Sequence, residues 1–108
     1  MVWLHGGGLY YGSGNGYLGV NSAYSGIVVT VNYRLGLLGF LNIPGSEIKG
    51  NYGMLNQVAA LKWVQENISS FGGIPSMVTT FGQGAGASSV AYRMLSPLST
   101  GLFQKAIV

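Results

Sequence analysis

The stretch MVTTFGQGAGASSVAYRML, residues 77–95, decides the fold class. Its apolar start at residues 77–81 predicts a buried strand. Residues 82–86 carry a glycine at every second position and predict a tight turn. Residues 87–95 then predict a helix that ends before Pro97. A strand that turns directly into a helix is the building unit of an α/β fold.

The rest of the chain continues this alternation of strands and helices. Short apolar or β-branched runs predict strands at residues 1–4, 27–33, 77–81 and 105–108. Residues 52–70 predict a helix, because apolar side chains recur there at helical spacing and Gly72-Gly73 follows. Residues 9–26 and 36–50 predict loops. We therefore expect an α/β fold with a mainly parallel sheet and helices on both faces.

The composition does not suit a free-standing small domain. Only 6% of the 108 residues are charged, against roughly 25% in ordinary globular proteins. Hydrophobic residues make up 48% of the chain, and 19 residues are glycines. A small domain has a high ratio of surface to volume and needs polar residues to cover it. We expect residues 1–108 to be an internal piece of one larger domain, with no second domain.

Charge, cysteine and histidine content exclude several classes of site. The net charge of +3 comes from scattered residues, so we expect no nucleic-acid partner. The chain has no cysteine and a single histidine, His5, so we expect no metal site and no cofactor. No run approaches the roughly 18 apolar residues of a membrane span, so we expect no membrane segment in this chain. No signal peptide pattern is visible, and the sequence leaves the localisation open.

Two glycine clusters follow predicted strands, at the strand ends where open α/β sheets bind ligands. The first is His5-Gly6-Gly7-Gly8, and the second is Gly82-Gln83-Gly84-Ala85-Gly86. With Ala87, the second cluster fits the dinucleotide pattern G-x-G-x-x-G/A, which needs an acidic residue about 20 positions later. No acidic residue follows Glu66. The cluster also fits a nucleophile elbow, G-x-S-x-G, with Gly84 in the serine position, and we favour this interpretation.

Nine short segments along the whole chain share their order and spacing with one protein family. They are VWLHGGG (2–8), VNYRLG (31–36), LGFL (38–41), GNYG (50–53), QVAALKWV (57–64), FGG (71–73), FG (81–82), LSP (95–97) and GLF (101–103). Together they resemble the type-B carboxylesterases, the cholinesterase-like family of α/β-hydrolases. The resemblance implies that residues 1–108 are a partial carboxylesterase type-B domain, from the oxyanion loop to just past the nucleophile elbow.

The resemblance implies a site that cleaves small-molecule carboxylic esters with a Ser-His-Glu/Asp triad. In such a site a serine forms the acyl-enzyme, and backbone N–H groups hold the oxyanion. Carried over by position, these donors are Gly7, Gly8 and Ala85, and the nucleophile position is Gly84. The acid and the catalytic histidine of the family lie downstream of this chain. We expect His5 to orient the glycine loop through hydrogen bonds rather than to act as a base.

Four positions depart from the family pattern. Gly84 has no oxygen with which to attack an ester, so we expect a site that is inactive as written. Ile74 replaces an Asp that normally pairs with the arginine matched by Arg34. If Arg34 is buried without another partner, this change costs roughly 3–5 kcal/mol. Asn56 and Gln83 stand where Asp and Glu are common in the family.

Relatives of the neuroligin type offer an alternative of another class. They also lack the nucleophile and often carry glycine there, in a similar Gly-x-Gly-x-Gly setting. Residues 101–107, GLFQKAI, fit these relatives well, whereas residues 95–99, LSPLS, fit the esterases better. Under this alternative the chain belongs to a non-catalytic cell-adhesion protein with a protein partner.

The triplet Asn67-Ile68-Ser69 matches the acceptor pattern for N-glycosylation. It lies near the end of a predicted helix, so the sequence leaves its use open.

Overall fold

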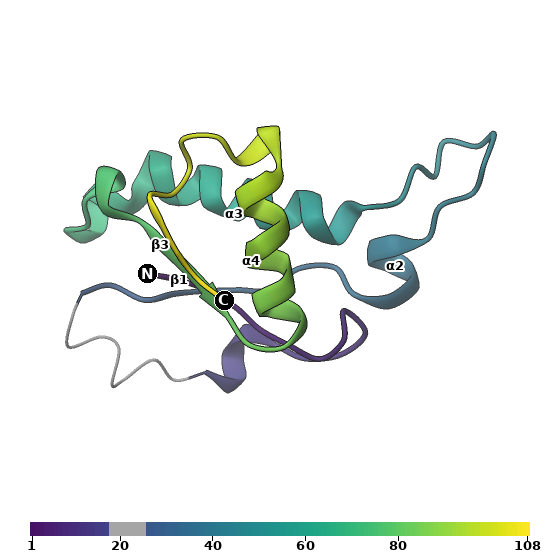
Figure 1. Ribbon diagram of the computed structural model, residues 1–108, viewed down its shortest axis with the longest axis horizontal. Coiled ribbons are helices and arrows are strands. Elements are labelled where there is room, and N and C mark those ends of the chain that lie inside the picture. Colours follow the sequence, from purple (N-terminus) through teal and green to yellow (C-terminus); the bar gives the residue numbers. More distant parts are fainter. Residues whose placement is uncertain (18–25) are drawn as a thin grey trace.

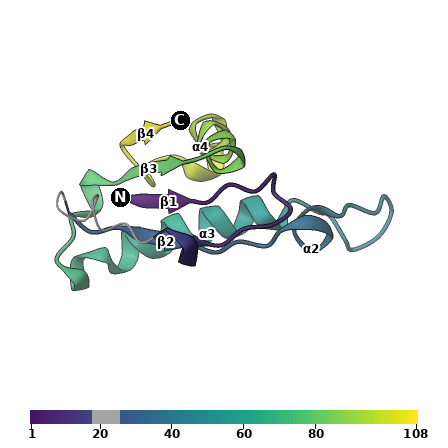
Figure 2. The same ribbon diagram turned by 90° about the horizontal axis from the view of Figure 1, so that it is seen from below.

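The computed structural model describes residues 1–17 and 26–108, which form a four-stranded parallel sheet with helices. The strands lie in the order β2-β1-β3-β4, as Figure 2 shows. Their bounds are Val2–Leu4 for β1, Val29–Val31 for β2, Thr79–Gly82 for β3 and Lys105–Ile107 for β4. The first strand of the chain lies inside the sheet, where Leu4 pairs with Val31 on one side and with Gly82 on the other. The carboxyl ends of these three strands therefore meet at one edge.

Two long helices cover one face of the sheet (Figure 1). α3 spans Tyr52–Asn67 and α4 spans Ala85–Leu95. Side chains alternate between the two faces of a strand, and Val2 and Leu4 point toward the helices. Both belong to one buried apolar cluster with Leu61 of α3 and Val90 of α4. Full burial of a side chain of this size stabilises the fold by roughly 1.5–3 kcal/mol.

Polar contacts also join the two helices. The Gln57 side-chain amide donates a hydrogen bond of 3.1 Å to the Ser89 hydroxyl. The Arg93 guanidinium donates one of 3.0 Å from Nη1 to the backbone carbonyl of Met54. All four residues are buried, and burial lowers the pKa of Arg93 because it desolvates the cation. These bonds fix the crossing of α3 and α4.

An aromatic cluster lies on the opposite face of the sheet. Trp3 and Phe81 are neighbours in the β1–β3 register, and their ring centroids lie 4.9 Å apart. Tyr17 stacks on Trp3 with a centroid distance of 4.4 Å, and the short η1 turn, Gly14–Gly16, immediately precedes it in the chain. The predicted parallel α/β fold is confirmed. Both of its long helices in the described residues lie on the face away from these aromatics.

Further short helices lie in the predicted loop at residues 36–50, at the end of the predicted helix at residues 52–70, before β3 and after α4. They are α2 at Gly36–Phe40, η2 at Ile68–Phe71, η3 at Pro75–Met77 and η4 at Pro97–Ser99. The loop predicted at residues 36–50 is therefore wrong over α2, because five residues are too few to show a helical period. A Cβ on Gly39 of α2 would collide with the Arg34 carbonyl oxygen, so this glycine permits the tight packing.

Several element boundaries also differ from the prediction. β3 begins at Thr79 because Pro75 starts a 3-10 turn before it. The strand predicted at residues 27–33 is limited to β2. In the loop predicted at residues 9–26, residues 18–25 lie outside the described part of the structure. Across the described ranges, no helix has the length and apolar character needed to cross a membrane.

Candidate functional site

The two glycine clusters lie side by side at the carboxyl edge of the sheet. β1 leads into residues 5–8 and β3 leads into residues 82–86, and these strands are neighbours. Both clusters line one hollow of about 430 Å³, together with parts of residues 11–17. The clusters approach so closely that a Cβ on Gly6 would lie 2.5 Å from the Gln83 carbonyl oxygen. The fold therefore brings together the two segments that the sequence singles out.

Gly84 is the apex of the turn between β3 and α4. Its backbone has φ 58° and ψ −121°, a combination that L-residues rarely adopt and that carries strain for any side chain. Gly84 is exposed and lines the hollow. A Cβ built on Gly84 meets no other atom within 4 Å. The apex thus has the strained strand-to-helix geometry of an elbow, with open space where a side chain would project.

The glycines on either side of the apex allow the turn to pack against the sheet. A Cβ on Gly86 would collide with the backbone carbonyl oxygen of Leu4 in β1. A Cβ on Gly82 would collide with the backbone of Gly86. These two glycines are therefore required for close approach rather than for flexibility. α4 starts at Ala85, two residues earlier than predicted, because the helix begins directly after the apex.

The triple-glycine loop, residues 6–8, turns back on itself beside the apex. Gly7 and Gly8 have positive φ angles of 109° and 62°, which glycine adopts without strain. The Gly7 carbonyl accepts hydrogen bonds from the backbone N–H groups of Tyr10 and Tyr11 at 3.0 and 3.1 Å. These bonds close the loop and orient the Gly7 carbonyl group toward its own chain.

Among the described residues, several backbone N–H groups at the hollow donate to no other group, and those of Gly7, Gly8 and Ala85 are among them. Ala85 is the first residue of α4, and the first N–H groups of a helix lack partners within the helix. The helix dipole adds partial positive charge at this end. The hollow therefore offers donors and a field suited to an oxygen atom that carries negative charge.

His5 is bound into the glycine loop. It is buried, and its Nδ1 lies 2.7 Å from the Gly6 carbonyl oxygen. Its ring stacks on Tyr33 at a centroid distance of 4.5 Å, and the Tyr33 hydroxyl donates to the His5 carbonyl at 2.6 Å. These contacts match the orienting role predicted for His5.

Arg34 does not carry the buried unpaired charge that the loss of the family Asp suggested. Arg34 is exposed. Its Nε and its backbone N–H donate to Asn56 Oδ1 at 3.0 and 3.1 Å. Its guanidinium also lies over the Tyr52 ring, 4.8 Å from the centroid. Solvent and these neutral partners remove the penalty, and Ile74 at the Asp position is itself exposed.

Sequence reasoning missed the third wall of the hollow, which includes Ser13 and Tyr17. Ser13 caps the η1 turn, where its hydroxyl accepts from the Asn15 N–H at 3.0 Å. The same hydroxyl donates to Asn32 Oδ1 at 3.2 Å. Ser13 is thus occupied by structural contacts. Nothing in the sequence of residues 13–17 alone indicates that this segment reaches the glycine clusters.

The described wall of the hollow carries hydroxyl groups only on Ser13, Tyr11 and Tyr17, and it carries no carboxylate. In the described ranges, no three His, Cys, Asp or Glu side chains come together as metal ligands. Besides these side chains, the wall presents the backbone N–H groups of Gly7, Gly8 and Ala85.

Comparison with known proteins adds to this geometry. Residues 1–108 match the model of the carboxylesterase family. The chain is 56% identical over 109 residues to neuroligin-2 of Mus musculus, covering 99% of this chain and 13% of that protein. It is 52% identical over 110 residues to cocaine esterase of Oryctolagus cuniculus, covering 100% of this chain and 21% of that protein. It is 50% identical over 109 residues to liver carboxylesterase 1 of Oryctolagus cuniculus, covering 99% of this chain and 19% of that protein.

Among solved structures, a thermophilic PNB esterase is similar with a TM-score of 0.90 and 50% sequence identity. That match covers 97% of this chain and 23% of the esterase chain. This chain therefore spans about a fifth or less of these relatives. The full-length match to the family model, the shared fold and the identities of 50% or more lead to one conclusion. The chain belongs to the carboxylesterase family.

Proposed function

We propose that this chain carries the oxyanion loop and the nucleophile elbow of an ester-binding site that no longer cleaves esters. The supporting observation is the hollow in which the triple-glycine loop meets the apex at Gly84. Residues 1–108 would form part of a longer carboxylesterase domain, with the catalytic acid and histidine supplied from downstream. The site needs no cofactor for this chemistry.

Recognition in the proposed site rests on the backbone. The N–H groups of Gly7, Gly8 and Ala85 would bind the carbonyl oxygen of a small carboxylic ester. In an active relative these donors strengthen their hold as the oxygen gains negative charge in the transition state. In this chain the ester carbon would face Gly84, which has no hydroxyl to form the acyl-enzyme. Loss of the nucleophile in another serine hydrolase lowers turnover about a million-fold.

The apex geometry supports the idea that a serine once stood at position 84. Backbone strain of this kind costs about 1–3 kcal/mol for a residue with a side chain and persists at functional sites. Gly84 relieves that strain while the turn keeps its shape. The open space above it would admit a serine side chain without a clash. Fold and site geometry can therefore outlast the activity.

Labelling with a fluorophosphonate tests this proposal in the complete protein. Trypsin cleaves after Lys62 and Arg93 and so releases peptide 63–93, which contains the apex. We expect no label on this peptide from the native protein. We expect Gly84→Ser to take up the label at residue 84, because downstream acid and histidine groups would activate the hydroxyl. Gly84→Ala is the matched control, since it adds the same backbone strain without an oxygen. Label on the native peptide at the elbow would contradict the proposal.

A non-catalytic binding protein of the neuroligin type is the second candidate. Its support is the 56% identity to neuroligin-2 of Mus musculus, against 50–52% for the two rabbit esterases. Under this proposal the partner is a protein, and the glycine at the apex is a lasting feature of the lineage. Failure of Gly84→Ser to label would favour this candidate, because the downstream triad groups would then be absent.

A further inference from the structure

We propose that Asn67 is an N-glycosylation site, an inference that is independent of any activity at Gly84. Asn67-Ile68-Ser69 is the single Asn-x-Ser/Thr triplet in the 108-residue sequence. Asn67 is the last residue of α3, and the chain continues directly into the 3-10 turn η2. An oligosaccharide is large and hydrated, so it is compatible with a fold only where the acceptor faces solvent.

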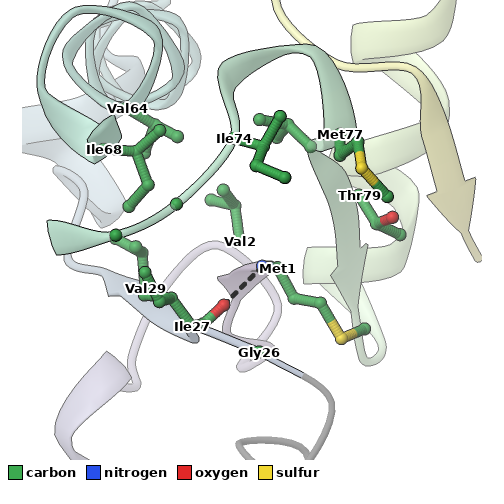
Figure 3. A pocket seen from close by; sticks show the side chains of 13 residues that line it. Met1, Val2, Gly26, Ile27, Val29, Val64, Ile68, Ile74, Met77 and Thr79 are labelled. Atoms are coloured by element: carbon green, nitrogen blue, oxygen red, sulfur yellow. Dashed lines mark hydrogen bonds between the residues drawn. The ribbon is translucent and has the colours of Figure 1, made fainter.

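The structure separates the three residues of the triplet between core and surface. The Ile68 side chain is 6% exposed and lines an apolar pocket with Val64, Val2 and Val29 (Figure 3). Successive residues of a helix point about 100° apart, so Asn67 and Ser69 flank the buried position. Asn67 is partly exposed and Ser69 is exposed. The two residues that define the acceptor are thus the two that reach the surface.

The hydrogen bonding of Asn67 is compatible with the modification. Its Nδ2 donates to the Trp63 carbonyl at 2.9 Å. An amide nitrogen carries two N–H bonds. In the transfer, this nitrogen attacks C1 of the first sugar of an oligosaccharide linked to a polyprenyl diphosphate. The bond between C1 and the diphosphate oxygen breaks, the lipid diphosphate leaves, and the nitrogen loses one proton. One N–H remains to donate to Trp63.

An exposed aromatic pair lies next to the acceptor. Trp63 stands four residues before Asn67 and Phe71 four residues after it, and their ring centroids lie 5.9 Å apart. Trp63 is 45% exposed and Phe71 is 63% exposed. The apolar face of a sugar ring packs well on an aromatic ring. The first sugar on Asn67 would cover this pair.

Peptide mapping of the complete protein, expressed in animal cells, tests the site. Trypsin cleaves after Lys62 and Arg93, so Asn67 lies in peptide 63–93. Treatment with peptide-N-glycosidase in heavy-oxygen water converts a glycosylated Asn67 into an isotope-labelled Asp. We expect this label in the native protein, together with a faster gel mobility after the enzyme acts.

Three variants test whether the label depends on the triplet at residues 67–69. We expect Ser69→Ala and Asn67→Gln to abolish the isotope label in peptide 63–93 and to reduce the mobility shift, and Ser69→Thr to keep both. Ser69→Ala leaves the acceptor amide in place, so its effect isolates the triplet from the fold. An unlabelled native peptide 63–93, or a label that persists in Ser69→Ala, would overturn the proposal. Neither outcome depends on fluorophosphonate labelling at the elbow.

Discussion

The Tyr33 hydroxyl donates a hydrogen bond to the His5 carbonyl at 2.6 Å, and the two rings stack with a centroid distance of 4.5 Å. Tyr33 follows β2, whereas His5 begins the triple-glycine loop after β1. The contact therefore fixes the loop relative to the sheet. Both residues are buried, and burial raises the pKa of Tyr33 because the charged phenolate would lose its solvation.

The Tyr33 contact predicts a pH-dependent contribution to stability. A phenol with a raised pKa in the folded state stabilises that state below the ordinary value of about 10. As pH rises above this value, the unfolded chain releases the proton first and the advantage is lost. We expect Tyr33→Phe to lower the unfolding free energy by about 1 kcal/mol at neutral pH, through the lost hydrogen bond. The difference in unfolding free energy between the native protein and Tyr33→Phe, measured by urea unfolding, should narrow above pH 10. A gap that stays constant would contradict the assignment.

The glycines around the elbow predict a contrast between two alanine substitutions. Gly86→Ala places a methyl group against the Leu4 carbonyl, so β1 and α4 must move apart. We expect a loss of about 2–3 kcal/mol in unfolding free energy, as for other overpacked sites. Gly16→Ala is the control in the wall of the same hollow, because its Cβ meets no atom within 4 Å. It should change stability by less than about 0.5 kcal/mol. Equal effects would show that α4 does not pack as described.

The contact between Asn56 and Arg34 predicts that Asn56→Asp stabilises the folded protein. Asn56→Asp keeps the acceptor oxygen and adds a negative charge beside the guanidinium. Because the pair is exposed, we expect a stabilisation of only about 0.2–1 kcal/mol, which decreases with added salt. Asn56→Ala removes both hydrogen bonds from Arg34 and should be destabilising. Thermal unfolding of the three proteins at low and high salt checks the order. A salt-independent gain would contradict the electrostatic explanation.

The sequence predicted the elements that have clear local signals. The β-branched run at residues 27–33, the helical spacing at residues 52–70 and the glycine turn at residues 82–86 all correspond to parts of observed elements. α2 escaped prediction because five residues show no period. Whether Arg34 is buried could not be predicted, because exposure depends on what packs around the side chain and a single sequence does not encode that locally.

The candidate site was predictable only in its two motifs. Gly84 and the loop at residues 6–8 could be identified because glycine patterns mark sharp turns after strands. Their proximity depends on β1 pairing with β3, which are more than 70 residues apart in sequence. Such long-range pairing has no local signal. Ser13 and Tyr17 line the hollow because of tertiary packing, which also has no local signal.

Hydrolysis of a small aryl ester by the complete protein tests the central proposal most directly. The initial rate of the native protein is compared with that of buffer, of Gly84→Ser and of Gly84→Ala. A site without a nucleophile predicts that native protein and Gly84→Ala match the buffer rate, while Gly84→Ser releases product in a burst. A burst from the native protein, with an acyl group trapped at the elbow, would contradict it.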